Sequence, residues 1–96
     1  MALDPILVAE CRAWLVKAAE DIATASFELQ ADPPFTSDIS FHSQKAVEKA
    51  LKAFLTWHGQ AFRKTHNLSE LGETCAAIDS TLTLLLKPAS VLTEYA

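Results

Sequence analysis

Basic side chains gather in one stretch of the chain, between residues 41 and 66. The stretch contains five bases and one acid, which gives 5 − 1 = +4, whereas the rest contains three bases and eleven acids, which gives 3 − 11 = −8. Its charged residues are Lys45, Lys49, Lys52, Arg63, Lys64 and the single acid Glu48. All three histidines, His42, His58 and His66, lie there too. Such a cluster is either a solvated face or a local anion-binding site.

The strongest candidate for a phosphate site is the end of this stretch. Arg63, Lys64 and His66 come just before Asn67, where a helix is predicted to begin, and the N–H groups of a helix N-terminus favour anions. We therefore expect these side chains to form a phosphate cradle with the N–H groups that follow Asn67. A second interpretation has His66 bonding the backbone near the helix start. The residues that either extend the cradle or form a solvated ridge are Lys45, Lys49 and Lys52.

Two further polar residues, Gln44 and Glu48, lie among these lysines. One interpretation makes them partly buried members of a network that fixes the register of a helix. The other makes them contacts for a nucleotide base or ribose. Glu48 also stands four residues before Lys52, the favourable order for an ion pair along a helix.

The sequence predicts neither a metal site nor a bound cofactor. His42 and His58 are sixteen positions apart on one predicted helix, so they point about 160° apart and cannot share a metal. His66 with Cys75 leaves too few ligands for a closed zinc site. The chain also lacks the nucleophile-elbow, phosphate-loop, dinucleotide-binding, zinc-protease and EF-hand motifs. No catalytic residue follows from motifs alone.

The elements that must position these residues are helical. Alanine and leucine supply 29 of the 96 residues, a composition that favours helix. A first helix is expected from about Pro5 to Gln30, with Asp4 as its N-cap and a broad apolar face from Leu7 to Leu29. The Asp-Pro-Pro run at residues 32–34 ends it.

The remaining elements follow the same logic. A second helix is expected over residues 39–58, capped by Ser37 or Asp38 and stopped by Gly59. A capping box at residues 67–70 opens a third helix that ends near Asp79. An apolar stripe then runs from Leu82 towards the C-terminus, with Pro88 kinking or restarting it. The prediction is a single all-α domain over residues 1–96, an antiparallel up-and-down four-helix bundle.

Composition narrows the class of protein. A net charge of −4 and a pI near 5.2 argue against a generally basic nucleic-acid binder. Cys11 and Cys75 fall on apolar helix faces and outside any CxxC pair, so we expect buried, reduced thiols in a cytoplasmic protein. Neither a secretory signal nor a membrane-spanning run is predicted.

Residues 41–53, with the sequence FHSQKAVEKALKA, resemble the signature of the HEPN domain family. Residues 65–68, followed by Leu71, and the first-helix segment at residues 14–22 are also similar to that family. The resemblance implies a bundle of four or five helices, usually dimeric. It also implies a nucleotide- or RNA-interacting partner of a minimal nucleotidyltransferase, often in a toxin–antitoxin pair. A dimeric helical scaffold without a ligand is an alternative, because the apolar faces are broad.

Many proteins of this family are metal-independent endoribonucleases with an arginine, four to six residues, and then a histidine. Here Arg63 and His66 are separated by only two residues, and Arg12 has no histidine within reach. If the chain cleaves RNA, we expect His66 as acid–base and Arg63 as the stabiliser of phosphorane charge. Similar family members also continue into an Arg-Tyr-Pro segment, so we expect either a truncated or a naturally short member.

Overall fold

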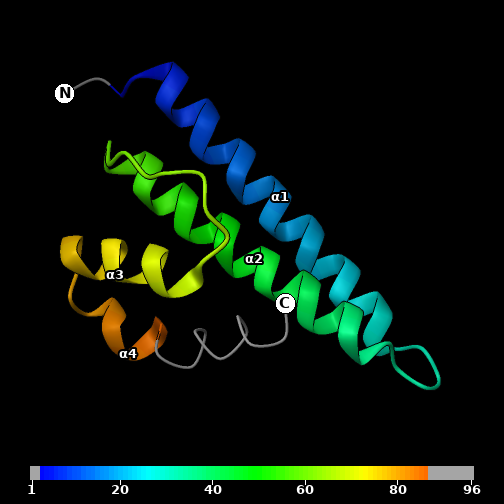
Figure 1. The fold of residues 1–96 in the computed structure, drawn as a ribbon. Coiled ribbons are helices and arrows are strands. Elements are labelled where there is room, and N and C mark those ends of the chain that lie inside the picture. The colour runs from blue at the N-terminus through cyan, green and yellow to red at the C-terminus, as the bar shows by residue number, and fades with distance from the viewer. Residues whose placement is uncertain (1–2, 87–96) are drawn as a thin grey trace.

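The computed structural model describes residues 3–86 and is helical, with no strand in that part of the chain. Its helices are α1 (Pro5–Leu29), α2 (Thr36–Trp57), α3 (Leu68–Ile78) and α4 (Leu82–Leu86). Figure 1 shows α1 and α2 as a long antiparallel hairpin, with α3 and α4 beside it. The predicted all-α class is confirmed for the described residues.

The start and end of α1 follow from local interactions. Asp4 Oδ1 accepts a hydrogen bond from the Ile6 backbone N–H at 2.9 Å, and Pro5 occupies the first helical position, where no N–H is needed. The helix ends at Leu29, three residues before the Asp32-Pro33-Pro34 run. The predicted bounds and N-cap are confirmed.

The predicted start and N-cap of α2 are wrong. The helix begins at Thr36 rather than at residue 39, and its N-cap is Phe35, whose side chain makes no capping bond. The Ile39 N–H bonds the Phe35 carbonyl at 2.9 Å, so Asp38 lies inside the first turn, where a negative charge suits the helix dipole.

The predicted stop at Gly59 is confirmed. Gly59 has φ +66°, and the N–H of Gln60 bonds the Leu55 carbonyl at 2.9 Å, which is a Schellman motif.

The α1–α2 contact is made by small buried residues. Ala18 and Ala25 from α1 and Ala46 and Ala53 from α2 are all less than a tenth exposed, which lets the two helices approach closely. The hairpin is the only contact of α1 with another described helix.

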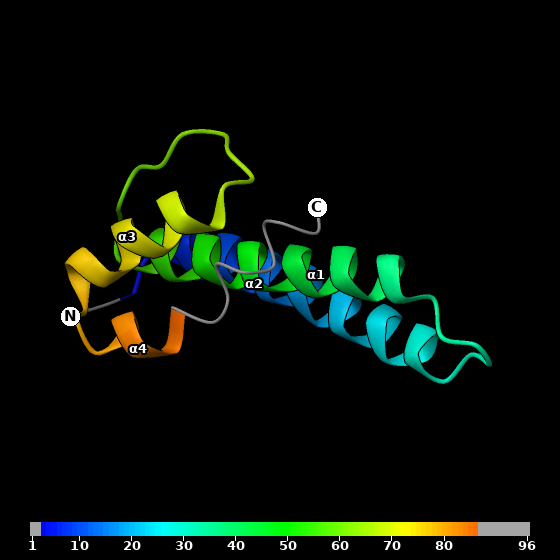
Figure 2. The same cartoon turned by 60° about the horizontal axis from the view of Figure 1, so that its bottom comes forward.

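The predicted apolar face of α1 is therefore only partly buried. Leu15, Ile22 and Leu29 remain more than half exposed, because no third layer among the described helices covers this side of the hairpin. In Figures 1 and 2, the hairpin end that carries the α1–α2 connection projects beyond α3 and α4.

The core lies between the C-terminal half of α2 and α3. Leu55, Leu71 and Cys75 are essentially inaccessible to solvent and pack with Leu51 and Leu68. Phe62 from the connecting loop and Leu82 from α4 cover the edge of this cluster. The core therefore holds α3, and with it the loop before α3, against α2.

A closed four-helix bundle is not formed by the described residues. Helix α4 has only five residues and contacts α3 but neither α1 nor α2. The predicted continuation of the apolar stripe through Ala89 and Leu92, and the predicted break at Pro88, lie outside the described residues. The observed arrangement is a long hairpin with α3 packed on one end and α4 packed on α3.

Candidate functional site

A buried carboxylate on α2 organises the polar side chains of the basic stretch. Glu48 is 3% exposed, and its Oε1 lies 2.8 Å from His66 Nδ1 and 3.6 Å from Lys45 Nζ. Its Oε2 lies 3.4 Å from Lys52 Nζ. Together with the neighbouring Gln44, these residues form what we call the Glu48 cluster: Gln44, Lys45, Glu48, Lys52 and His66.

Helical spacing and one turn bring the cluster together. Gln44, Glu48 and Lys52 are four positions apart along α2, so their side chains lie on one stripe, with Lys45 beside them. His66 comes from the loop that follows the Gly59 turn. Asn67 Oδ1 accepts the Glu70 N–H at 3.1 Å and so fixes the start of α3 directly after His66.

The half of the predicted capping box in which Asn67 caps the helix is confirmed. The reciprocal half is not formed. The Asn67 N–H bonds Thr65 Oγ1 at 3.1 Å, and the Glu70 carboxylate turns to Arg63 instead.

Lys52 lies in the interior and not on a solvated ridge, which corrects one of the two interpretations of the lysines. The residue is 7% exposed, and its Nζ lies 5.3 Å from the centre of the Trp14 ring. A buried ammonium needs an opposite charge, and Glu48 supplies it from the preceding turn of the helix. Trp14 comes from α1, 38 residues before Lys52 in the sequence.

His66 can take two alternative hydrogen bonds through the same nitrogen. Its Nδ1 is 2.8 Å from Glu48 Oε1 and 3.1 Å from Lys45 Nζ. When Nδ1 carries a proton it donates to Glu48, and when it does not it accepts from the Lys45 ammonium, which can only donate. The interpretation that His66 bonds the backbone at the helix start is wrong for this structure.

Gln44 is the member of the Glu48 cluster whose hydrogen-bonding capacity the described residues do not fill. The residue is 2% exposed, and its Oε1 has no hydrogen-bond partner among the described residues. Leaving a buried acceptor without a donor costs about 1–3 kcal/mol. The predicted burial of Gln44 and Glu48 is confirmed, and Glu48 is the member that joins a network.

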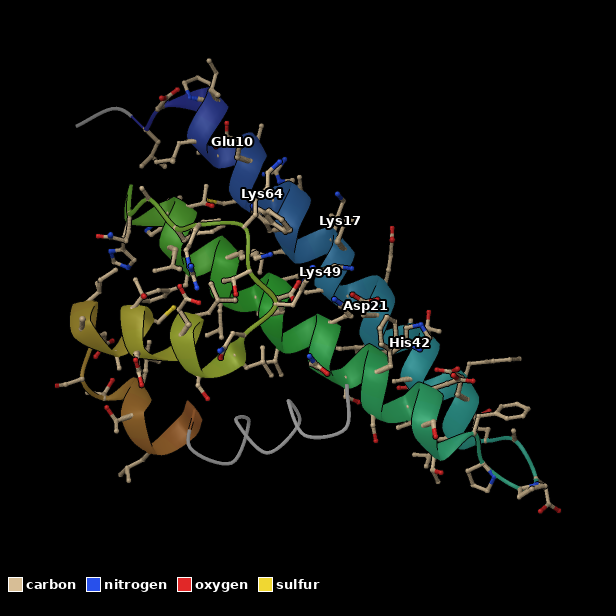
Figure 3. All side chains as sticks on the ribbon, in the orientation of Figure 1. Glu10, Lys17, Asp21, His42, Lys49 and Lys64 are labelled. Carbon is tan, nitrogen blue, oxygen red and sulfur yellow. The ribbon has the colours of Figure 1, made fainter. Side chains whose placement is uncertain are left out.

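The other predicted site residues are directed elsewhere. Lys49 Nζ bonds Asp21 Oδ2 of α1 at 2.6 Å, and Figure 3 shows these two labelled residues side by side. Arg63 donates two hydrogen bonds to Glu70, at 2.6 and 2.9 Å. Lys64 is exposed.

The predicted cradle of Arg63, Lys64 and His66 is therefore not assembled as one unit. The reason is that Glu70, in the first turn of α3, presents a carboxylate that matches the fork of the guanidinium. The hydrogen bonds to Glu70, with the charge of that carboxylate, raise the pKa of Arg63. The same hydrogen bonds lower the pKa of Glu70. Arg63 and His66, the two residues expected to cooperate in RNA cleavage, are bound to different acids.

Two residues beside the cluster were not predicted to have a role. His42 Nδ1 lies 2.6 Å from Glu28 Oε1 of α1. Phe41 is 45% exposed, and Lys45 Nζ lies 5.5 Å from the centre of its ring. The spacing of Phe41, four residues before Lys45, is the signal that could have identified it.

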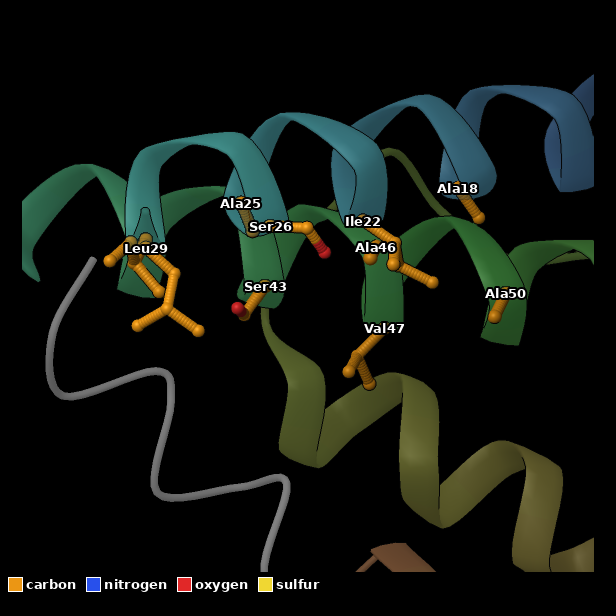
Figure 4. Close-up of a pocket in the computed structure, with 10 residues that line it drawn as sticks. Ala18, Ile22, Ala25, Ser26, Leu29, Ser43, Ala46, Val47 and Ala50 are labelled. Atoms are coloured by element: carbon orange, nitrogen blue, oxygen red, sulfur yellow. The ribbon is translucent and has the colours of Figure 1, made fainter. Parts of the chain in front are cut away.

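An uncharged groove follows the open side of the hairpin and is shown in Figure 4. Its volume is about 470 Å³, with Ala18, Ala46 and Ala50 among the small residues that line it and Ile22 and Leu29 among the large ones. A second hollow of about 330 Å³ shares Ala50 and continues towards Cys11 and Trp57. None of the described residues that line either hollow is charged.

The cysteines are buried, as predicted. Cys11 lines the second hollow, and Cys75 lies in the core with its Sγ 3.7 Å from the Leu51 carbonyl. Burial raises the pKa of the Cys75 thiol to about 11, so this thiol is protonated at neutral pH.

Within residues 3–86, no three histidine, cysteine or acidic side chains are grouped so that they could hold a metal ion. No helix in that part of the chain is both long and apolar enough to cross a membrane.

Comparison with known proteins supports the resemblance noted in the sequence. Neither the curated proteins nor the solved structures include a significant match. The sequence model of the HEPN domain matches residues 11–96, which covers α1 from its second turn onwards and everything that follows. The chain therefore belongs to the HEPN domain family.

Proposed function

We propose that this protein binds a nucleotide or RNA through phosphate contacts at the edge of the Glu48 cluster formed by Lys45 and His66. Membership of the HEPN family supports a role related to nucleotides or RNA. The observation that carries the proposal is the charge of the cluster, in which two ammonium groups share one carboxylate.

The positively charged groups of the cluster differ in how far solvent can reach them. The Lys52 side chain is 8% exposed and so out of reach, whereas the side chains of Lys45 and His66 are 19% and 72% exposed. An incoming phosphate would meet the Lys45 ammonium and, when His66 is protonated, a second donor. Lys64, two residues before His66, is exposed and adds a positive charge to the loop that carries His66.

The test is binding of a fluorescein-labelled RNA octamer at low salt, measured by anisotropy. Lys45→Gln removes a phosphate contact, so we expect several-fold weaker binding and a slope of log Kd against log salt that is smaller by about 0.7. Arg12→Gln is the matched control, because Arg12 is exposed on α1 and its loss changes the net charge equally. Equal effects of the two substitutions would show that only overall charge matters and would end the proposal.

Partnership with a minimal nucleotidyltransferase, in a toxin–antitoxin pair, is the finer part of this proposal. Its support is the resemblance of residues 41–53 and 65–68 to that group of HEPN proteins. The check is co-expression with the product of the neighbouring reading frame, if that frame encodes such an enzyme, followed by co-purification. Absence of a nucleotidyltransferase gene beside this one would count against the pairing.

The uncharged groove favours a second role, self-association of two copies through the open side of the hairpin. Ile22 and Leu29 are more than half exposed there, and two such faces packed together would bury apolar surface on both copies. We expect sedimentation to show a dimer that Ile22→Glu dissociates. Leu84→Glu, at an 82% exposed position of α4, is the control and should leave the dimer intact. A wild-type monomer at micromolar concentration would contradict this role.

A further inference from the structure

Phe41 exposes an aromatic ring beside the cations of the Glu48 cluster. It lies on α2 four residues before Lys45 and seven before Glu48, so it continues the same stripe one turn towards the helix N-terminus. The residue is 45% exposed, so a large apolar side chain is in contact with water.

The neighbours of Phe41 hold its ring in place. Lys45 Nζ lies 5.5 Å from the ring centre, within the range of a cation–π contact. The His42 ring meets it in a T-shaped arrangement at 5.3 Å and 79°. His42 is itself fixed by Glu28 Oε1 at 2.6 Å and by the Asp38 carbonyl at 2.9 Å. The exposed ring therefore lies against two side chains, each of which is itself held by a further polar contact.

The nearby lysine distinguishes Phe41 from the other exposed phenylalanines. Phe27 and Phe35 are more exposed, at 76% and 57%, but neither has a lysine over its ring within the described residues. An anionic ligand would therefore find a lysine over the ring of Phe41 and, among the described residues, none over the other two rings.

We propose that Phe41 is a stacking platform for an unpaired base, so that the ligand is single-stranded RNA or a nucleotide rather than a bare phosphate or a sugar phosphate. The inference rests on the proposed function, because it places the base of a ligand whose phosphate meets Lys45. Bases stack on aromatic rings with little dependence on sequence. Proteins that bind single strands combine such rings with cationic side chains that contact the phosphates of the nucleic acid.

The experiment uses the full chain and two labelled probes of equal length and charge, an oligoadenylate RNA octamer and an abasic ribose-phosphate octamer. Phe41→Leu keeps an apolar side chain but removes the ring. We expect it to weaken binding of the RNA octamer about tenfold and to leave the abasic probe unchanged. Phe41→Trp should retain RNA binding. Phe35→Leu is the control and should change neither affinity, and circular dichroism should show the same helicity for every variant.

Three outcomes would overturn the inference, and they differ in whether they also overturn the proposed function. Equal weakening of both probes by Phe41→Leu would mean that the ring only positions Lys45. An unchanged RNA affinity in Phe41→Leu, with Lys45→Gln weakening both probes, would remove the platform and keep the proposed function. Failure of the wild-type chain to bind either probe would remove the proposed function and the inference with it.

Discussion

Replacing the buried carboxylate tests the central feature of the structure, the dependence of several cations on Glu48. In Glu48→Gln the side chain keeps its shape but loses its charge, while Lys52 stays in place with a side chain only 8% exposed. Removing one partner of a buried ion pair typically costs about 3–5 kcal/mol, because it leaves an uncompensated charge inside the protein. The glutamine carbonyl can still accept from Lys52, so we expect the lower end, about 3 kcal/mol.

This loss is large for a chain of this size. Small domains are stable by about 5–15 kcal/mol, and m-values in urea are about 1–3 kcal/mol per molar. We therefore expect the urea midpoint, followed by circular dichroism, to fall by about 1–3 M. Protein concentration must be equal in all samples, because a self-associating chain gains stability with concentration.

Matched variants separate this explanation from a general loss of surface charge. Glu70→Gln removes the same charge from the exposed pair with Arg63 and should change the midpoint far less. Adding Lys52→Met to Glu48→Gln removes the stranded ammonium and should recover part of the loss, so the double variant is less destabilised than the sum of the single ones. If Glu48→Gln costs no more than Glu70→Gln, the carboxylate is effectively hydrated and the argument from burial is refuted.

Two further predictions concern groups whose pKa the fold displaces. The pKa of Cys75 is raised to about 11, so at pH 8 iodoacetamide should alkylate Cys75 slowly in the folded chain and readily in the urea-unfolded chain. Mass spectrometry of the peptide that contains Cys75 measures the extent of alkylation. Rapid alkylation in the folded state would contradict the prediction. The pKa of Glu70 is lowered from 4.5 by its bond to Arg63, so this pair stabilises the fold above about pH 4.5 and the contribution disappears as pH falls through the lowered value. Urea titrations between pH 3 and 6 should show a shallower loss of stability in Glu70→Gln and in Arg63→Gln, and an unchanged slope in both would refute the assignment.

The parts of the fold that could be predicted from the sequence depend on interactions within a few residues. Asp4, Gly59 and Asn67 mark helix ends through bonds to backbone groups two to three positions away, or through a positive φ that glycine adopts easily. The start of α2 does not follow from such a pattern, because its N-cap, Phe35, makes no side-chain capping bond.

The candidate site could be predicted only in part, because its pairings join distant residues. The cationic stretch and the burial of Gln44 and Glu48 follow from residue types and helical spacing. The ion pair of Lys52 with Glu48 also follows from helical spacing. The partners of Lys49 and Arg63 do not follow, since Asp21 lies on α1 and Glu70 in the first turn of α3, and neither does the contact of Lys52 with Trp14 of α1. These contacts occupy Lys49 and Arg63 and bury Lys52. Lys45 and His66 are left as the accessible edge of the Glu48 cluster, with Lys64 as an exposed cation outside it.

The closure of the bundle could not be predicted for a different reason. Apolar periodicity shows which face of α1 can be buried, but it does not show whether a neighbouring helix covers that face. Ile22 and Leu29 satisfy the pattern and yet stay more than half exposed beside the groove. Their pattern is therefore as compatible with a surface between two copies as with the core of a single chain.

Helix α2 separates the two proposed roles by placing them on different sides of its axis. At 100° per residue, Val47 and Ala50, which line the groove, lie about 200° and 140° around the helix from Lys45. An RNA or nucleotide at Lys45, His66 and Phe41 would therefore not compete for space with a second copy seated in the groove. Two copies joined through their grooves would each keep an accessible Glu48 cluster, so a dimer would present two phosphate sites facing away from the shared interface.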